Sequence, residues 1–509
     1  MLMSAAEYRD SLRRYKPRVF VNGKRIDSVA DEPSLAPGIA ATGVTYDFAL
    51  MDQHKSIMTA RQTTSGKIVN RMLHIDETST DLLYKLEATR LVCAESGCAQ
   101  RYLSHDGLNA IFQATKRIDA EATAPSDTHD LFIDYMHKMQ DQDLTLGIAM
   151  TDAKGDRSKR PGAQLNRDVY VHIKERRKDG IVIRGTKAIV TGGPYCHEFL
   201  VMPCRTHSEE DKAFAVCCAV PCDAEGLTII SRPAGRFGDP SAKYASKYGQ
   251  ATAVLQFDDV FVPRDRVFAD GQVEAAGFLT TSYATHHRHS CIGARAGFGD
   301  LLIGAGALMI EANGLDPDRH GHIRDAMVDL IKIVEGFFAC GVAASVYATK
   351  DPAGSVMPDA VFSNVGKLLL ATQIYDMHRL AHHVSGGLIV ALPGPDEDHN
   401  PETAASLAAV LAGRPDVPAS ARLEVARLME DLTATHTGGW MSVISLHGGG
   451  SPEAMKREIW RNYPVGDKRK LVEKLLDRGI LDEGKRVSKQ PDRCCATGCE
   501  VPKLPNAAE

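Results

Sequence analysis

The sequence predicts an α+β protein in which a central β domain lies between an N-terminal helical domain and a C-terminal helical bundle. Three observations predict this class: apolar residues recur with helical spacing at first, alternate with a period of two in the middle of the chain, and return to helical spacing beyond residue 280. The expected units are a helical domain at 1–142, a β domain at 143–277, a bundle at 278–480 and a tail at 481–509.

The N-terminal unit is expected to be mainly helical with one short β-hairpin. Ser4 and Glu7 have the spacing of a capping box, and Asn22-Gly23 is a hairpin turn signal. Helical periodicity at 81–120 is interrupted at Ser96-Gly97. This interruption predicts that Cys98 stands at the start of a helix.

The middle unit is expected to consist of strands. Apolar residues alternate along 169–173, Asp179-Gly180 supplies a turn, and an apolar run returns at 181–190. Further strand-like runs lie at 197–203, 213–220, 227–232 and 253–262. An all-β unit with antiparallel hairpins follows from this pattern.

The last unit is expected to be a bundle of antiparallel helices with short connections. Helical patterns occupy about 283–313, 322–349, 358–390, 402–412 and 419–436, with shorter ones to 480. Residues 485–509 are polar, contain proline and lack periodicity, so we expect a tail. Its Cys494, Cys495 and Cys499 lack a fourth ligand for zinc.

Charge and composition exclude several classes of function. Sixty Lys and Arg against 65 Asp and Glu give a net charge of −5, without the basic excess that nucleic acid or anionic membranes require. The N-terminus lacks an apolar leader, the run at 301–310 is too short for a bilayer, and the cysteines form no disulfide framework. We therefore expect a cytoplasmic protein with reduced thiols. Motifs of Rossmann, P-loop, α/β-hydrolase and zincin enzymes are absent from the sequence.

Two loops in the β domain could hold a cofactor. Lys154, Gly155 and Arg157 follow an apolar run, and such a loop can bind phosphate through backbone N–H groups and cations, although a solvated loop is the alternative. Thr191-Gly192-Gly193 would let backbone and hydroxyl approach a flat ring, although an ordinary turn explains it too.

Two helical segments and a glycine loop carry further candidates. Cys98 and Tyr102 are spaced to share one helix face, and a thiol at a helix N-terminus is reactive, although most single cysteines are small buried hydrophobes. His286, His287 and His289 point in different directions on a helix and should not converge on one metal ion. Residues 447–450 could cradle an anionic group or form a plain loop.

Five segments together resemble one enzyme family. They are 151–158 (TDAKGDRS), 182–188 (VIRGTKA), 257–263 (FDDVFVP), 287–290 (HRHS) and 447–452 (HGGGSP). They are similar to the 4-hydroxybutyryl-CoA dehydratases and, more distantly, to the oxygenase component of 4-hydroxyphenylacetate 3-monooxygenase, over residues 1–480. This resemblance implies an acyl-CoA-dehydrogenase-like fold, bound FAD and a homotetramer. The flavin contacts it implies are Thr151, Lys154, Gly155, Asp156, Arg157, Thr191, Gly192, His447, Gly448, Gly449 and Gly450.

The chain departs from the dehydratase pattern at the catalytic positions. The four positions matching the iron–sulfur ligands are Cys98, Tyr102, His287 and Ala294, so two of four ligands remain and no cluster is expected. The dehydratases' glutamates are matched by Thr252 and Ile444, which cannot accept a proton. The hydroxylase pattern is also incomplete, since Tyr102 is kept but Cys98 and Gly147 replace an Arg and a His.

The expected function is a cluster-free, FAD-dependent monooxygenase that receives reduced flavin from a separate reductase and acts on a small aromatic or related substrate. The expected site residues are Tyr102, His287 and Arg295 facing the flavin, with Cys98 lining the pocket. The alternative is a cluster-free acyl-CoA dehydratase or isomerase with His287 as base. A third possibility is a non-catalytic paralogue that keeps only the scaffold.

Overall fold

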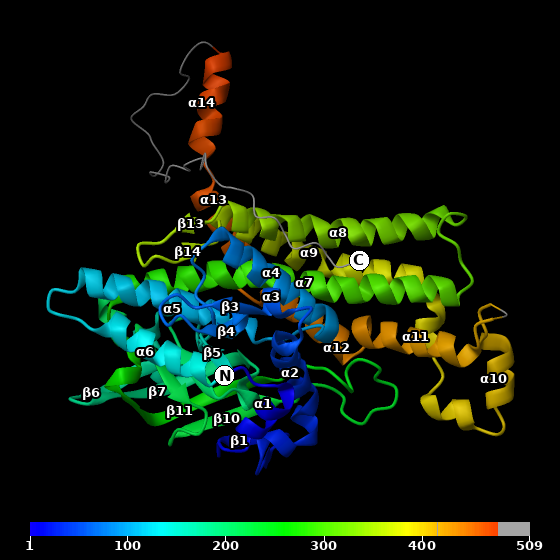
Figure 1. Ribbon diagram of the computed structural model, residues 1–509, viewed down its shortest axis with the longest axis horizontal. Helices are drawn as coiled ribbons and strands as arrows, with labels where there is room; N and C mark the ends of the chain where they lie inside the picture. The colour runs from blue at the N-terminus through cyan, green and yellow to red at the C-terminus, as the bar shows by residue number, and fades with distance from the viewer. Residues whose placement is uncertain (415, 477–509) are drawn as a thin grey trace.

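The computed structural model describes residues 1–414 and 416–476. Sheets form one layer, the N-terminal helices cover them, and the long helices of the bundle lie beyond these helices (Figure 1). Short 3-10 turns join many of the elements. This arrangement places the middle of the bundle against the N-terminal helices, where the candidate site lies.

Six helices belong to the N-terminal part. They are α1 Ala5–Leu12, α2 Ala36–Leu50, α3 Lys55–Met58, α4 Ser79–Ser96, α5 Tyr102–Glu121 and α6 Thr128–Asp141. The expected capping box of Ser4 and Glu7 starts α1. Helix α4 ends at Gly97, whose φ of 65° reverses the chain. Helix α5 begins only at Tyr102, so the prediction that Cys98 starts a helix is wrong: it lies in the connecting turn.

Two sheets form the β layer. The first is six-stranded, in the order β2-β1-β10-β11-β7-β6, and the second is four-stranded, in the order β12-β9-β8-β5. The strands of the first are β1 Arg18–Val21, β2 Lys24–Arg25, β6 His172–Arg177, β7 Gly180–Thr191, β10 Leu227–Arg232 and β11 Thr252–Pro263. Those of the second are β5 Leu146–Ala149, β8 Glu198–Val201, β9 Val216–Pro221 and β12 Val267–Asp270.

The predicted hairpin is confirmed by the antiparallel pairing of β6 with β7. The N-terminal hairpin is not a separate unit, however, because β1 pairs in parallel with β10. Two small strand pairs lie outside both sheets: β3 Thr59–Arg61 with β4 Ile68–Asn70, and β13 Thr349–Lys350 with β14 Val356–Met357. A short pairing of this kind has little sequence signal, and neither was predicted.

The bundle contains three long helices and several shorter ones. They are α7 Val273–Ala312, α8 Gly321–Val346, α9 Ala360–Ser385, α10 Ala404–Leu411, α11 Ala419–Thr433, α12 His436–His447, α13 Pro452–Asn462 and α14 Val465–Leu475. Helix α7 starts ten residues before the predicted 283, because Ala275, Ala276 and Leu279 are buried by tertiary packing despite the polar residues that follow. The predicted tail and its cysteines lie outside the described residues.

Helix α7 is the core of the bundle. Within residues 1–414 and 416–476, it is the one helix that is long and apolar enough to cross a membrane, but 67% of its most apolar window is buried inside the protein. It packs against α4, α5, α8 and α9. Its apolar length is therefore accounted for by packing.

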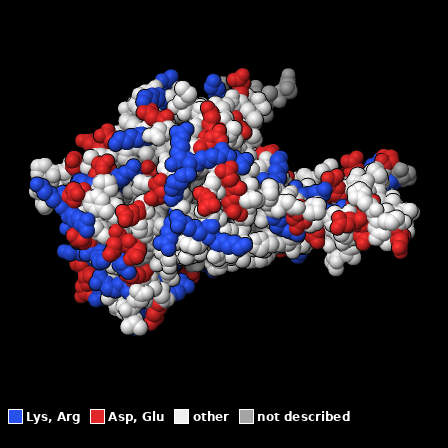
Figure 2. Space-filling view, turned by 90° about the horizontal axis from the view of Figure 1, so that it is seen from below, with Lys and Arg blue, Asp and Glu red and all other residues white. Residues whose placement is uncertain are grey.

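On the face seen from below, Lys and Arg are interspersed with Asp and Glu (Figure 2).

Candidate active site

Tyr102 and His287 meet where α5 packs against α7. Their rings are nearly parallel, at 19°, with centroids 6.2 Å apart. Tyr283, one turn before His287 on α7, is also nearly parallel to the imidazole, with centroids 5.4 Å apart. All three side chains are buried. The expectation that Tyr102 and His287 share one site fits this geometry.

A buried ionic network orients His287. Asp106, one turn after Tyr102, lies with Oδ2 3.2 Å from His287 Nδ1. Ser290 donates to the other carboxylate oxygen at 2.6 Å, and Lys85 Nζ from α4 lies 3.6 Å from it. Burial opposes ionisation, but Lys85 and the imidazoles hold the pKa of Asp106 well below its usual range. An ionised Asp106 therefore fixes the ring of His287.

Two thiols flank the aromatic pair. Cys291 Sγ lies 3.6 Å from His287 Nε2, and Cys98 Sγ lies 3.8 Å from Arg295 Nη1. Burial opposes both charges of the Cys291–His287 pair, but their mutual attraction lowers the pKa of Cys291 to about 7. The same attraction, with the hydrogen bond to Asp106, raises the pKa of His287 to about 9. His287 is therefore a proton donor at neutral pH.

Arg295 connects this cluster to the C-terminal helices. Its Nε donates to Ser445 Oγ of α12 at 2.6 Å, and Lys367 Nζ of α9 donates to the carbonyl of Ser445 at 2.6 Å. The four expected catalytic residues thus form two contacting pairs, Tyr102 with His287 and Cys98 with Arg295.

The predicted phosphate loop is anchored to β7. Thr151 accepts a hydrogen bond from the Ala188 N–H at 2.8 Å, and Gln164 bonds both backbone groups of Asp156, at 3.0 and 2.7 Å. Lys154 and Gly155 have φ of 73° and 51°, and the Lys154 N–H donates to the Val169 carbonyl at 3.1 Å. Arg157 is exposed. The loop is therefore ordered and presents a cation.

The other two segments that were expected to contact flavin lie beside the cluster. Gly192 has φ 70°, and a Cβ there would lie 2.6 Å from Gln100 Nε2, in the turn that carries Cys98. The carbonyl of Gly449 accepts from Arg288 Nε at 2.9 Å, and a Cβ there would lie 3.4 Å from His287 Cδ2. Within the described residues, no hydrogen bond or ion pair joins Lys154–Arg157 to Tyr102 or His287.

The positions matched to the dehydratases' glutamates also lie beside these segments. Thr252 pairs with Thr191 in the sheet, and Ile444 precedes Ser445 on α12. Neither side chain can exchange a proton at neutral pH.

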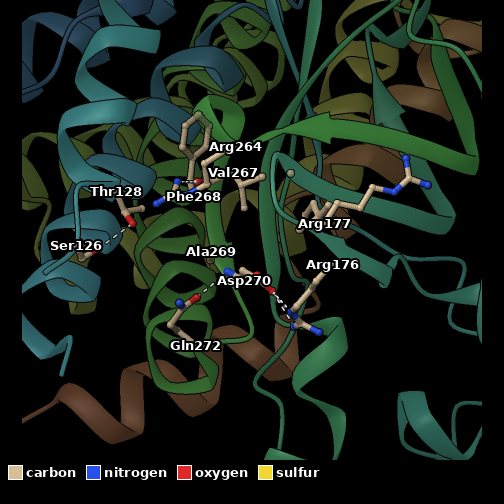
Figure 3. A pocket seen from close by; sticks show the side chains of 12 residues that line it. Ser126, Thr128, Arg176, Arg177, Arg264, Val267, Phe268, Ala269, Asp270 and Gln272 are labelled. Carbon is tan, nitrogen blue, oxygen red and sulfur yellow. Dashed lines mark hydrogen bonds and ion pairs between the residues drawn. The ribbon is translucent and has the colours of Figure 1, made fainter. Parts of the chain in front are cut away.

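A cavity of about 20 Å³ reaches Cys98, which is room for roughly one water. Its other lining residues include Arg232, Tyr244, His436 and Trp440. A separate pocket of about 230 Å³ lies between β6, β12 and the start of α6 (Figure 3).

The arginines of that second pocket are already paired with carboxylates. Arg176 bonds Asp270 at 2.7 Å, and Arg264 bonds Asp127 at 2.9 Å. The third, Arg177, bonds Glu175 of its own strand. This pocket shares no lining residue with the cavity at Cys98. Because carboxylates already neutralise its arginines, it is a weaker candidate for binding an anion than the loop that carries Arg157.

No group of three or more His, Cys, Asp or Glu side chains in the described chain is arranged to hold a metal. His286, His287 and His289 do not converge, as predicted. His287 contacts Asp106 and His289 lies 2.8 Å from Ser345 Oγ, whereas burial lowers the pKa of His286 to about 3.

Sequence reasoning missed Asp106 and Ser445 and gave Cys291 no catalytic role. A signal was available for two of them, because Asp106 follows Tyr102 by four residues and Cys291 follows His287 by four. Ser445 has no comparable signal, since only tertiary packing brings α12 to Arg295.

These features are those of a flavoprotein family with a helical, β and helical arrangement. The family models for the N-terminal and C-terminal parts of 4-hydroxyphenylacetate 3-hydroxylase match residues 4–269 and 276–477. The chain belongs to this family, which confirms the resemblance and the expected fold class.

Two kinds of relative share the family. The chain is 33% identical to 4-hydroxybutyryl-CoA dehydratase/vinylacetyl-CoA-Δ-isomerase of Clostridium aminobutyricum over 93% of this chain and 99% of that protein. It is 24% identical to the 4-hydroxyphenylacetate 3-monooxygenase oxygenase component of Thermus thermophilus over 96% and 99%.

Two solved structures show the same ranking, in which a dehydratase is more similar to this chain than a monooxygenase component is. An oxygen-tolerant archaeal 4-hydroxybutyryl-CoA dehydratase from N. maritimus has a TM-score of 0.91 at 32% identity, covering 96% of this chain and 98% of that one. A 4-hydroxyphenylacetate 3-monooxygenase oxygenase component, complexed with FAD and 4-hydroxyphenylacetate, has a TM-score of 0.83 at 21% identity, covering 93% and 98%.

Proposed function

We propose that the protein is an FAD-binding enzyme that moves a proton on an acyl-CoA thioester, as an isomerase or lyase. The higher identity to the dehydratase/isomerase, 33% against 24%, supports an acyl-CoA substrate. The observation that carries the proposal is the buried cluster of Tyr102, His287 and two thiols, which offers proton donors and a thiolate but no metal ligand set in the described residues. We therefore rank the acyl-CoA isomerase or lyase, which was the alternative in the sequence analysis, above the monooxygenase that was expected first.

The two thiols are the physical reason to rank the isomerase or lyase above the monooxygenase. A monooxygenase would use molecular oxygen at this site, and a thiolate is the form of cysteine that oxidants attack. Cys291 and Cys98 both lie within the site network. A reaction that needs no oxygen leaves these thiols intact.

The chain's own residues fit bound FAD. Lys154 and Arg157 can meet its phosphates, and the segments at Gly192 and Gly449 pass so close to the site that a Cβ would contact Gln100 or His287. When bound, FAD supplies electron-transfer chemistry beside the acyl chain.

The polar residues act on the thioester carbonyl. Burial raises the pKa of Tyr102 well above 10, so its phenol stays protonated, and His287 is an imidazolium at neutral pH. The phenol of Tyr102 can donate a hydrogen bond to a carbonyl oxygen, and the imidazolium beside it adds positive charge, which together stabilise the enolate formed when the α-proton leaves. Asp106 and Ser290 keep His287 in the orientation that this needs. His287 is thus a donor rather than the base that the sequence reasoning proposed.

The test is anaerobic incubation of the FAD-loaded protein with vinylacetyl-CoA in D₂O. Isomerisation to crotonyl-CoA with deuterium at the α or γ carbon supports the proposal, and NMR reports both. No exchange and no isomerisation with this or other short acyl-CoA thioesters would exclude it.

The second candidate is the monooxygenase. It is favoured by Tyr102, a phenol shared with the hydroxylases where the dehydratases have a thiol. Oxygen consumption and hydroxylated product with 4-hydroxyphenylacetate, a flavin reductase and NADH would establish it instead. Only this candidate requires a separate reductase as partner.

We also propose a cytoplasmic homotetramer. Exposed apolar side chains on the bundle support self-association; they include Leu308, Val328, Ile331 and Tyr375. Analytical ultracentrifugation tests the tetramer, and fractionation of cells tests the compartment.

A further inference from the structure

The molecule holds a hydrogen-bonded chain of carboxylate, imidazole and thiol, and the proposed function gives its thiol, Cys291, no role in the reaction. From this geometry we propose that Cys291 is the base that removes the α-proton of the acyl-CoA, with His287 and Asp106 as its positioning residues. The inference rests on the proposed function and names the group that moves the proton.

The three side chains are ordered so that the imidazole uses both nitrogens. Asp106 Oδ2 lies 3.2 Å from Nδ1 of His287, and Cys291 Sγ lies 3.6 Å from Nε2. Cys291 and His287 are four residues apart on α7, so one turn of helix fixes their separation. The arrangement is that of an activated cysteine: a thiol beside an imidazole that a third group orients.

The groups facing Cys291 favour a thiolate. His287 and Arg295 lie one turn before and after it on α7, and Lys367 faces it from α9, all cationic or proton-donating. The carboxylate of the triad, Asp106 of α5, is neutralised by Lys85 of α4 and lies on the far side of the imidazole. The phenols of Tyr102 and Tyr283 flank the ring without carrying charge.

Other buried cysteines differ from Cys291. Cys196 and Cys218 lie in the apolar core between the sheets, and burial alone raises the pKa of Cys196. Within the part of the chain that the structure describes, neither sulfur is hydrogen-bonded to an imidazole. Apolar packing therefore accounts for the presence of Cys196 and Cys218. It does not account for the hydrogen-bonded imidazole and carboxylate beside Cys291.

The step balances without any oxidant. The thiolate takes the α-proton: the S–H bond forms, the Cα–H bond breaks, and the electron pair moves onto the thioester oxygen, to which Tyr102 donates a hydrogen bond. The S–H group then returns the proton to the γ carbon as the electron pair shifts the double bond from β,γ to α,β. Cys291 ends as a thiolate again.

The experiment measures α-proton exchange and isomerisation of vinylacetyl-CoA in D₂O by the FAD-loaded protein without oxygen. Cys291→Ser, whose hydroxyl cannot ionise at neutral pH, should lower both by about a hundredfold or more. Cys340→Ser on α8 is the matched control and should retain the wild-type rate, because its thiol is partly exposed and donates to the Gly336 carbonyl of its own helix. Bound flavin should be equal in all three proteins.

A second readout is independent of turnover. The ultraviolet thiolate absorbance of the wild type at neutral pH should exceed that of Cys291→Ser and fall in His287→Gln. No difference between wild type and Cys291→Ser would overturn the inference. So would wild-type exchange in Cys291→Ser, which leaves the proposed function standing. If the wild type itself exchanges no acyl-CoA proton, the proposed function fails and this inference with it.

Discussion

Reversing the charge of Arg157 tests the phosphate loop directly. Arg157 is exposed and has no ion pair within the described residues, so Arg157→Glu should change the free energy of unfolding by less than about 0.5 kcal/mol. If the guanidinium bonds a pyrophosphate oxygen of FAD, losing that charge-assisted contact should weaken binding by more than about tenfold, or about 1.4 kcal/mol. The added carboxylate repels the phosphate and enlarges the effect.

The assay is fluorescence titration of the apoprotein with FAD at fixed ionic strength. Lys178→Glu is the control, because Lys178 is an exposed cation in the turn between β6 and β7 and its reversal changes the net charge equally. It should leave the dissociation constant within about twofold. Equal affinities for wild type and Arg157→Glu would refute the contact, and equal weakening by both variants would reduce it to a general field effect.

Three further predictions concern the buried cluster. Iron and sulfide assays on anaerobically prepared protein should find no cluster, because Tyr102 and Ala294 stand at two ligand positions; about four irons per chain would contradict this. Lys85→Met should lower the free energy of unfolding by about 3–5 kcal/mol in urea, because it leaves Asp106 buried without its cation, and an unchanged midpoint would show that the pair is not ionised. The pKa of His287 is raised from 6.5 to about 9, so its ionic stabilisation is complete below pH 6.5 and is lost as pH rises through 9. The difference in free energy of unfolding between wild type and His287→Gln should therefore shrink between pH 6.5 and 9. A difference that stays constant with pH would contradict the raised pKa.

Local patterns were sufficient for most of the fold. The alternation along 169–190 predicted the β6–β7 hairpin, and the helical spacing beyond residue 320 predicted α8 and α9 within a few residues. These succeed because side-chain periodicity reflects which face is buried. The start of α5 was missed because Gly97 ends α4 and the next four residues form a turn whose shape depends on its neighbours.

The sequence by itself determined which chemistry was possible: the departures at Tyr102 and Ala294 remove two ligands of an iron–sulfur cluster, and the loop at 151–157 has the residues of a phosphate site. Only the tertiary structure decided which groups act together. Residues 181 positions apart, Asp106 and His287, meet because α5 packs on α7, and that contact makes the imidazole a donor. Burial and the distances between charges set the protonation of Cys291 and His287, and neither quantity can be read from the order of residues along the chain.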